Sequence, residues 1–412
     1  MVEIMAPAGS FECLRAAIKA GADSVYFGVG ELNMRSHSAG NFKIEDLTEV
    51  AEICGGAGVR TYLTVNTIIY DSDFNEMKKI IDAAKDAGID AVIACDMAVI
   101  KYANSIGLSV HSSTQLNVSN IEAVEFYSKY TDVIVLAREL NLEQIKEICD
   151  EVKKREIRGP SGEIVKIEIF CHGALCVSIS GKCYMSLAQY GFSANRGKCF
   201  QTCRRKYRVV DDEDGSELVV DNDYVMSPKD LCTIGFLDKI LESGVSVLKI
   251  EGRARGADYV YTVTKTYKEA AESYYSGGYS LEKVSGWINE LSKVFNRGFW
   301  HGGYYLGKEL GKWAGCSGSL ATQKKFLIGR VLHYYDKINV AHLDIFDLEI
   351  KSGDELIITG STTGIVEVNV GEVFKNGELA SGKVSGADVS IKVLEKVRKN
   401  DRVWLVEKNK IG

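Results

Sequence analysis

Long apolar runs are missing from this sequence, and proline is scarce. No apolar stretch approaches the roughly 18 residues that a membrane-spanning helix needs, and the opening MVEIMAPAGS lacks the basic and apolar parts of a secretory signal. Three prolines among 412 residues, with 46% hydrophobic and 26% charged residues, indicate a globular protein. We therefore expect a cytoplasmic protein without a membrane partner, long enough for two or three domains.

Histidine is also scarce, with six in the chain, and this limits the hydrolytic sites that the sequence could form. Neither a G-x-S-x-G nor an H-E-x-x-H motif occurs. A cysteine or serine protease needs a histidine partner, and only His172 lies near the cysteine-rich segment. A metalloprotease would be expected to hold zinc with histidine and carboxylate ligands. Peptide hydrolysis is therefore poorly supported.

Acidic residues are absent from one segment of the chain. From Cys171 to Val210 there are seven Lys or Arg residues and no Asp or Glu. Residues 1–150 carry 12 basic against 22 acidic residues, whereas residues 151–210 carry 12 against 4. This segregation of charge predicts that a polyanion or a multiply charged small anion binds near the basic segment.

The same basic segment contains four cysteines with the spacing C-x6-C-x15-C-x3-C, namely Cys176, Cys183, Cys199 and Cys203. Thiolates suit either an iron–sulfur cluster or Zn²⁺, and the wide first spacing favours the cluster over the short paired knuckles of structural zinc sites. Four unrelated thiols are the duller alternative. Cys232 could replace one ligand or lie within a helix. The odd total of eleven cysteines argues against a disulfide framework.

Buried β-rich runs alternate with helical patterns along the first two thirds of the chain. Eight such strands predict a (β/α)8 TIM-like barrel, with helices such as Phe11–Ala20 and Asp73–Ala87 between them. A doubly wound sheet is the alternative, but no G-x-G-x-x-G follows the first strand. The predicted strands are Glu3–Ala6, Ser24–Gly28, Arg60–Asn66, Ala91–Asp96, Ser109–Gln115, Asp132–Ala137, Lys166–Cys171 and Val245–Ile250.

We predict three parts for the chain. Residues 1–277 form the barrel domain, with a cysteine-rich insertion at 172–226 after the seventh strand; Ser227, Pro228 and Asp230 are expected to begin the following helix. Residues 278–320 connect to a small C-terminal β-barrel over 321–412, where short alternating strands are joined by Gly, Asn and Asp turns. Because catalytic residues of such barrels lie on the loops after strands, the insertion should carry the chemistry.

Charged residues at the predicted strand ends are candidates for binding and proton transfer. Arg138 and Arg253 are expected to bind a carboxylate or phosphate, since guanidinium binds either bidentately; a salt bridge is the alternative for each. Glu168, His172 and Glu251 are candidates for proton transfer, with a structural histidine as the alternative for His172.

A basic run follows Cys203, the last of the four cysteines. The aromatic residues Phe200 and Tyr207 lie just before this run and within it. Cations beside aromatic rings suit single-stranded RNA, whose bases stack on such surfaces. A solvated basic face is the alternative. The residues predicted to hold the RNA backbone are Arg204, Arg205, Lys206 and Arg208.

The stretch Glu168-x-Phe170-x2-Gly173-Ala-Leu-Cys176-x4-Gly181-x-Cys183-x-Met185-Ser186 resembles the signature of the peptidase family of unknown catalytic type, long called collagenase-like proteases. Further similar stretches are AGADSVYFG near the start, LAREL at 136–140, SPKDL at 227–231 and KIEGR at 249–253. The resemblance covers nearly the whole predicted barrel.

The resemblance implies an oxygen-independent enzyme. Some family members hydroxylate a pyrimidine at C5 in tRNA or rRNA, with prephenate, a small dicarboxylate, as hydroxyl source and a [4Fe–4S] cluster on four cysteines. The family's cysteine pattern falls on Cys176, Cys183, Cys199 and Cys203. Two alternatives follow from the same resemblance: a collagenase-like peptidase, and a hydroxylase subunit that needs a homologous partner subunit, as in anaerobic ubiquinone synthesis.

Overall fold

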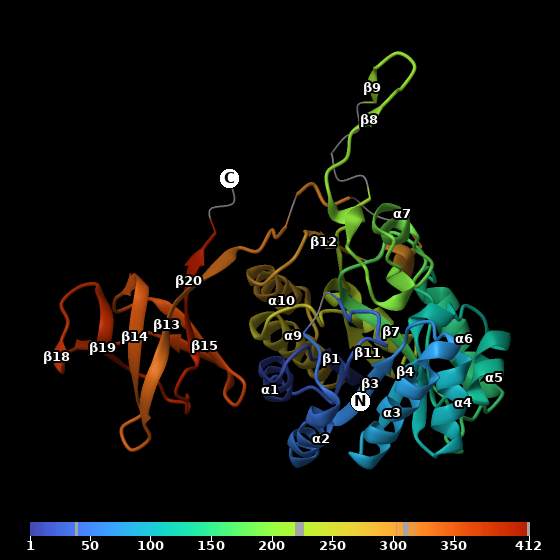
Figure 1. The fold of residues 1–412 in the computed structure, drawn as a ribbon, viewed down its shortest axis with the longest axis horizontal. Helices are drawn as coiled ribbons and strands as arrows, with labels where there is room; N and C mark the ends of the chain where they lie inside the picture. Colours follow the sequence, from blue (N-terminus) through green and yellow to red (C-terminus); the bar gives the residue numbers. More distant parts are fainter. Residues whose placement is uncertain (38–39, 219–225, 302, 308–312, 317, 410–412) are drawn as a thin grey trace.

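Eight parallel strands close into a barrel in the computed structural model, which describes residues 1–37, 40–218, 226–301, 303–307, 313–316 and 318–409 (Figure 1). The barrel closes because the seventh strand pairs in parallel with the eighth, and the eighth pairs with the first. The predicted barrel is confirmed, and the doubly wound alternative is wrong. The strands are β1 Glu3–Pro7, β2 Ser24–Gly28, β3 Arg60–Val65, β4 Ala91–Ala94, β5 Ser109–Ser112, β6 Val133–Val135, β7 Lys166–Gly173 and β11 Val247–Ile250.

Helices surround the barrel, and local sequence signals fix their ends. Ser10 caps the first helix by accepting a hydrogen bond from the Cys13 N–H. Gly21, Gly88 and Gly244 follow three of the helices with φ of 81°, 78° and 89°, a left-handed conformation that favours glycine. The helices are α1 Phe11–Lys19, α2 Leu47–Gly56, α3 Phe74–Asp86, α4 Met97–Ser105, α5 Ile121–Ser128, α6 Leu142–Lys154, α8 Leu237–Glu242 and α9 Ala257–Tyr275.

No helix in the described ranges combines the length and the apolarity that a membrane crossing needs. The apolar core lies mainly between strands and helices, where α1 packs on α9 and the helical faces are buried. The barrel interior holds a second, smaller cluster that includes Met5, Tyr26 and Tyr62. Charged groups share this interior, because the Lys249 ammonium donates to buried Glu168 at 2.8 Å.

The insertion between β7 and α8 is built of short elements at the carboxyl ends of the strands (Figure 1). It contains α7 Met185–Tyr190, two 3₁₀ turns and the hairpin of β8 Val209–Val210 and β9 Glu217–Leu218. It ends in β10 Asp230–Cys232, which runs antiparallel to the end of β7.

The helix predicted to begin at Ser227 is wrong, since β10 occupies this place and α8 starts at Leu237. The carboxylate of Asp230 does not cap a helix; it accepts a hydrogen bond from the buried Arg297 guanidinium at 3.1 Å. Cys232 consequently lies in a strand, where it is fully buried and stands opposite His172 in the register of β10 with β7.

Beyond the barrel, α10 Leu281–Lys293 packs against α9, and β12 Phe299–Trp300 extends the sheet beside β10. An antiparallel sheet of eight strands follows, in the order β16-β15-β20-β13-β14-β19-β17-β18. Its strands are β13 Gln323–Tyr335, β14 Val340–Ile350, β15 Glu355–Gly360, β16 Gly364–Asn369, β17 Val373–Lys375, β18 Glu378–Leu379, β19 Val384–Lys392 and β20 Arg402–Lys408.

This C-terminal sheet has its own apolar core, to which nearly all of its strands contribute. The predicted small β-barrel is corrected to a sheet that folds over this core, because no pairing in the described strands joins β16 to β18. The sheet lies against the barrel domain beside α1 (Figure 1). Lys19 on α1 donates to the Ile365 carbonyl at 3.0 Å, and Arg15 donates to the Ser361 carbonyl at 2.9 Å.

Candidate functional site

A cavity of about 170 Å³ opens at the carboxyl ends of the barrel strands, beneath the insertion. Strand residues form its floor: Tyr26 comes from β2, Thr64 from β3, Phe170 from β7 and Lys249 from β11. The loop after β7 covers the opposite side. This is the place where a (β/α)8 barrel holds its catalytic groups.

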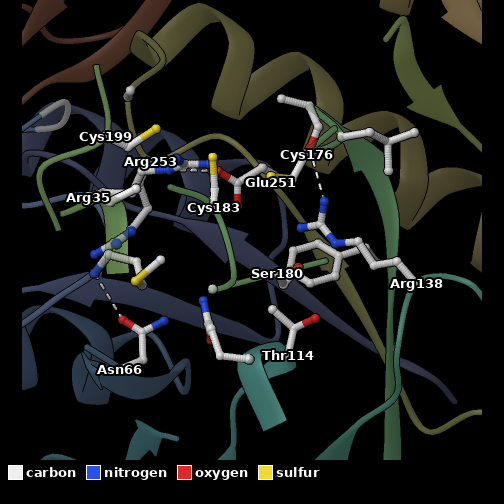
Figure 2. Close-up of a pocket in the computed structure, with 18 of the residues that line it drawn as sticks. Arg35, Asn66, Thr114, Arg138, Cys176, Ser180, Cys183, Cys199, Glu251 and Arg253 are labelled. Carbon is white, nitrogen blue, oxygen red and sulfur yellow. Dashed lines mark hydrogen bonds and ion pairs between the residues drawn. The ribbon is translucent and has the colours of Figure 1, made fainter. Parts of the chain in front are cut away.

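All four cysteines of the predicted ligand set line this cavity: Cys176, Cys183, Cys199 and Cys203. Figure 2 shows Cys176, Cys183 and Cys199 among the side chains that line the cavity, together with Arg253. Burial raises the pKa of Cys203 to about 11, with Arg204 lowering it and the other three thiols raising it. The Cys203 sulfur is therefore near enough to the other three thiols for their charges to affect it.

The thiols do not form a closed site for a single metal ion as they stand. Within the described ranges, no three side chains of His, Cys, Asp or Glu come close enough to share one ion. The donor set itself nevertheless suits a cluster, because it consists of four soft thiol groups on an irregular loop beside cations.

Close packing onto the barrel fixes the course of the insertion. Gly197 has φ of 84°, and a Cβ atom there would lie 2.2 Å from the Ser36 Oγ in the loop after β2. Gly181 has φ of 76°, and its Cβ atom would lie 2.7 Å from the Gln115 side chain, which follows β5. Only glycine fits these two approaches, so they hold the insertion against two barrel loops.

Arg196 fastens the insertion to the loop after β3. Its guanidinium donates to the Ile68 carbonyl at 2.8 Å and to the Asp73 carboxylate at 3.1 Å, and it stacks 4.2 Å from the centre of the Tyr70 ring. The hydrogen bond to Arg196, ahead of the opposing effect of burial, lowers the pKa of Asp73. The Cys199 loop, which begins directly after Arg196, is thereby placed over the cavity.

The cavity wall is strongly cationic, with Glu251 as the one acidic residue among the described lining residues. Arg35 pairs with Glu251 at 2.8 Å. Lys249 and Arg297 also form ion pairs, with Glu168 and Asp230 respectively, which do not line the cavity. The remaining four make no ion pair in the described part of the chain. The seven basic residues of the wall are Arg35, Arg138, Arg204, Lys249, Arg253, Arg255 and Arg297.

Arg138 and Arg253, both predicted to bind an anion, do line the cavity. Arg253 is 4% exposed and donates to the Thr64 hydroxyl at 2.8 Å; burial lowers its pKa to about 10. Arg138 lies 3.9 Å from the centre of the Phe170 ring, and its buried Nε has no hydrogen-bond partner. Guanidinium groups with unused donors can bind an anion bidentately, so both residues are placed as the prediction requires, and their binding of an anion stays a prediction.

Glu251, predicted to transfer a proton, also lines the cavity, but its carboxyl group is fully ionised near neutral pH. Burial would raise its pKa, yet Arg35, Arg138 and Arg253 together lower it to about 2. The Tyr26 hydroxyl donates to the Ile250 carbonyl at 2.8 Å beside it. A carboxyl group with such a pKa holds no proton near neutral pH, so Glu251 orients cations rather than donating a proton.

Two predicted proton-transfer residues lie outside the cavity lining. His172 is buried, its Nδ1 lies 3.3 Å from the Tyr267 hydroxyl, and burial lowers its pKa to about 3. Glu168 is fully buried behind Lys249, and burial raises its pKa. Lys249, which the sequence reasoning missed, faces the cavity in their place.

The basic run does not act as one surface. The Arg204 side chain turns inward, donating to the carbonyls of Leu175 and of Pro228, the latter at 2.7 Å, so it lines the cavity, and its contact with an RNA backbone stays a prediction. Arg205 and Lys206 are exposed. Arg208 is exposed as well, with its Nε 3.7 Å from the Glu217 carboxylate.

Arg35 was missed because it lies in an irregular loop seven residues after β2. Its ion pair with Glu251 joins distant parts of the chain, so no local sequence pattern predicts that Arg35 belongs to the site. The sequence did carry a signal for Lys249: it stands two residues before Glu251, which directly follows β11, so the alternation of side chains places both on the same side of the chain.

Residues 9–314, which span the barrel from α1 onward together with its insertion, match the family model described as Peptidase family U32. The chain belongs to this family. Its resemblance to collagenase-like proteases, drawn from the motif around Cys176, is therefore confirmed.

Relatives within Peptidase family U32 carry two kinds of name. The chain is 52% identical over 406 residues to a "Collagenase" of Porphyromonas gingivalis strain W83, with 98% of each chain covered. It is 34% identical over 303 residues to "tRNA hydroxylation protein P1" of Bacillus subtilis, covering 72% of this chain and 69% of that one. It is 33% identical over 305 residues to "23S rRNA 5-hydroxycytidine C2501 synthase" of Escherichia coli, covering 72% and 44%.

Proposed function

We propose that this protein is an iron–sulfur enzyme that hydroxylates a pyrimidine base at C5 in tRNA or rRNA, without oxygen, using a small prephenate-like dicarboxylate. One observation carries the proposal: four thiols and several guanidinium groups without acidic partners line the same cavity. Thiolates supply a cluster, and guanidinium groups supply the site for an anionic co-substrate.

Cys176, Cys183, Cys199 and Cys203 would hold a [4Fe–4S] cluster, which supplies one-electron chemistry when bound. Zinc is the alternative, but its bonds of about 2.3 Å to sulfur require four sulfurs within about 4 Å of one another. The described residues contain no such closed group. A larger cluster accepts sulfurs that stand further apart, and nearby arginines stabilise the added negative charge.

Arg138 and Arg253 would bind the carboxylates of the co-substrate. Both guanidinium groups hydrogen-bond to neutral partners, the Ala174 carbonyl at 3.2 Å and the Thr64 hydroxyl at 2.8 Å, and neither forms an ion pair in the described part of the chain, so both can pair with a ligand carboxylate. Glu251 holds Arg35 beside them. The Lys249 ammonium, held by Glu168, lies on the cavity floor and is the candidate to donate a hydrogen bond to the ligand there.

The RNA substrate is supported by the relatives named for tRNA hydroxylation and for 5-hydroxycytidine synthesis in 23S rRNA. The insertion beside the cavity carries seven basic and no acidic residues from 171 to 210. Such a surface favours a polyanion by neutralising phosphates.

A peptidase is the second candidate, favoured by the relative named collagenase at 52% identity. The cavity gives it little support: none of its described lining residues is a histidine, and His172 lies buried elsewhere. A thiol nucleophile would lack the base that activates it.

The test combines metal analysis with nucleoside mass spectrometry. Protein purified without oxygen should contain iron and sulfide and absorb visible light, whereas zinc alone would contradict the proposal. The tRNA and rRNA of a deletion strain should lose one hydroxylated pyrimidine, restored by the wild-type gene but not by Arg253→Ala. An unchanged nucleoside profile, together with gelatin cleavage by the purified protein, would establish the peptidase instead. Restoration in cells without activity of the pure chain would indicate a homologous partner subunit.

A further inference from the structure

An exposed cluster of aromatic rings lies on the insertion, outside the cavity. Tyr190 is 40% exposed and Phe192 is 46% exposed. Both rings lie beside half-buried Phe200, with ring centres 5.0 Å and 5.7 Å away and interplanar angles of 39° and 38°. Neighbouring rings at such shallow angles form a stepped surface that the apolar core does not cover.

The packing of Phe200 holds this cluster in place. Its ring centre lies 4.6 Å from that of His37, in the loop after β2. Its backbone N–H donates to the Ser186 hydroxyl at 3.1 Å. The ring surface is thus formed before any ligand arrives, which reduces the entropy lost on binding.

Two cations accompany the rings. The Lys198 ammonium lies 5.3 Å from the centre of the Phe192 ring, and the Arg205 guanidinium lies 5.4 Å from that of Tyr190. Arg205 also donates a hydrogen bond to the Tyr190 hydroxyl. We call these five residues the aromatic face: Tyr190, Phe192, Lys198, Phe200 and Arg205.

The aromatic face adjoins the cavity along the chain. Asn195 lies between Phe192 and Lys198 in the sequence, and Cys199 lies between Lys198 and Phe200. Both residues line the cavity. A flexible strand lying on the aromatic face would therefore pass the cavity mouth. Rings that stack on bases, cations that bind phosphates and no acidic residue from 171 to 210 together match single-stranded RNA.

We propose that the aromatic face binds unpaired bases of the RNA substrate by stacking, next to the base that enters the cavity. This inference rests on the proposed function and adds the surface that holds the RNA. It differs from the sequence-based choice of residues by including Lys198, which lies beside the Phe192 ring, in place of Arg204, whose side chain turns inward.

The chain provides a matched control on α5. Phe126 is 51% exposed, its ring centre lies 5.1 Å from that of Tyr127, and the Lys129 ammonium lies 6.0 Å from its centre. Acidic Glu122 and Glu125 lie on the same helix. Phe126→Ala therefore removes an exposed ring beside a cation without touching the insertion.

The experiment measures binding of a short fluorescein-labelled oligouridine RNA to the full chain, purified without oxygen, by fluorescence anisotropy. We expect Tyr190→Ala combined with Phe192→Ala to weaken binding at least about fivefold for each base that loses its ring. Tyr190→Phe combined with Phe192→Trp should bind like the wild type, as should Phe126→Ala. Iron content and the thermal unfolding midpoint report whether each variant keeps its fold.

The outcomes separate this proposal from the proposed function. If the wild type binds RNA and the double alanine variant binds equally well, the aromatic face is not the RNA surface, while RNA hydroxylation stands. If the wild type binds no RNA, and gelatin peptides lose affinity in the double alanine variant, both proposals fail. Reduced RNA affinity, together with a smaller salt dependence in Lys198→Ala combined with Arg205→Ala, would support the assignment.

Discussion

Replacing Glu251 by glutamine should destabilise the barrel, because this carboxylate is ionised among three arginines. Its pKa falls from an ordinary value near 4.5 to about 2, which corresponds to about 3 kcal/mol of stabilisation at neutral pH. Glu251→Gln keeps the shape but removes the charge that Arg35 faces at 2.8 Å. We expect urea unfolding, followed by circular dichroism at pH 7, to show a loss of this size.

The pH dependence gives the sign of the effect. Because the folded pKa is lowered, the contribution of Glu251 is complete above pH 4.5 and is lost as the pH falls toward 2. The wild type should therefore lose more stability over this range than Glu251→Gln does. Asp150→Asn, which breaks an exposed pair with Lys146, is the control and should change little. Equal stability of Glu251→Gln and wild type at pH 7 would refute the reasoning.

Three further substitutions test the site. Cys183→Ser should lose most of the iron and the visible absorption, whereas Cys54→Ala, a buried thiol on α2, should keep both. Arg253→Lys should raise the KM for the dicarboxylate about tenfold or more, measured by steady-state kinetics, since lysine cannot bind a carboxylate bidentately. Arg196→Ala should release the insertion, seen as about tenfold faster limited proteolysis within 172–208; unchanged cleavage would show that its bonds to the β3 loop do not hold the insertion.

Much of the barrel could be predicted because its signals are local. β2 matches the prediction residue for residue, and β1, β3 and β7 differ by two residues or fewer at their ends. Buried runs of apolar residues define these strands, and glycines such as Gly21 and Gly244 mark the preceding helix ends.

The segment around Asp230 shows where local signals fail. The sequence predicts a helix that begins with Ser227, Pro228 and Asp230. In the structure, Arg297, far along the chain, pairs with the Asp230 carboxylate, and the backbone of this segment pairs with β7 as a strand. Tertiary contacts outweighed a capping pattern that contributes about 1 kcal/mol.

The candidate site also combines features that local sequence patterns predict with features that depend on tertiary contacts. The cysteine spacing and the basic segment are visible in the sequence, and the structure brings all four thiols to one cavity. The partners of individual cations were not visible, because Arg35 pairs with Glu251 across 216 residues. The inward turn of Arg204 likewise depends on carbonyls that only the folded loop presents.

Positive charge therefore lies on two separate surfaces, and only the outer one comes wholly from the basic segment 171–210. Arg138 and Arg253 face the cavity, where they share the Glu251 carboxylate with Arg35 and where the proposed anionic co-substrate would add further negative charge. Lys198 and Arg205 lie outside over aromatic rings, where solvent screens their charge and only a polyanion gains much from several of them at once. Because one short insertion supplies both the thiols and the outer cations, an anion in the cavity and an RNA strand on the aromatic face would contact the same segment of the chain. Loss of the cavity ligand should then loosen the aromatic face as well, which links the occupancy of the cavity to RNA affinity.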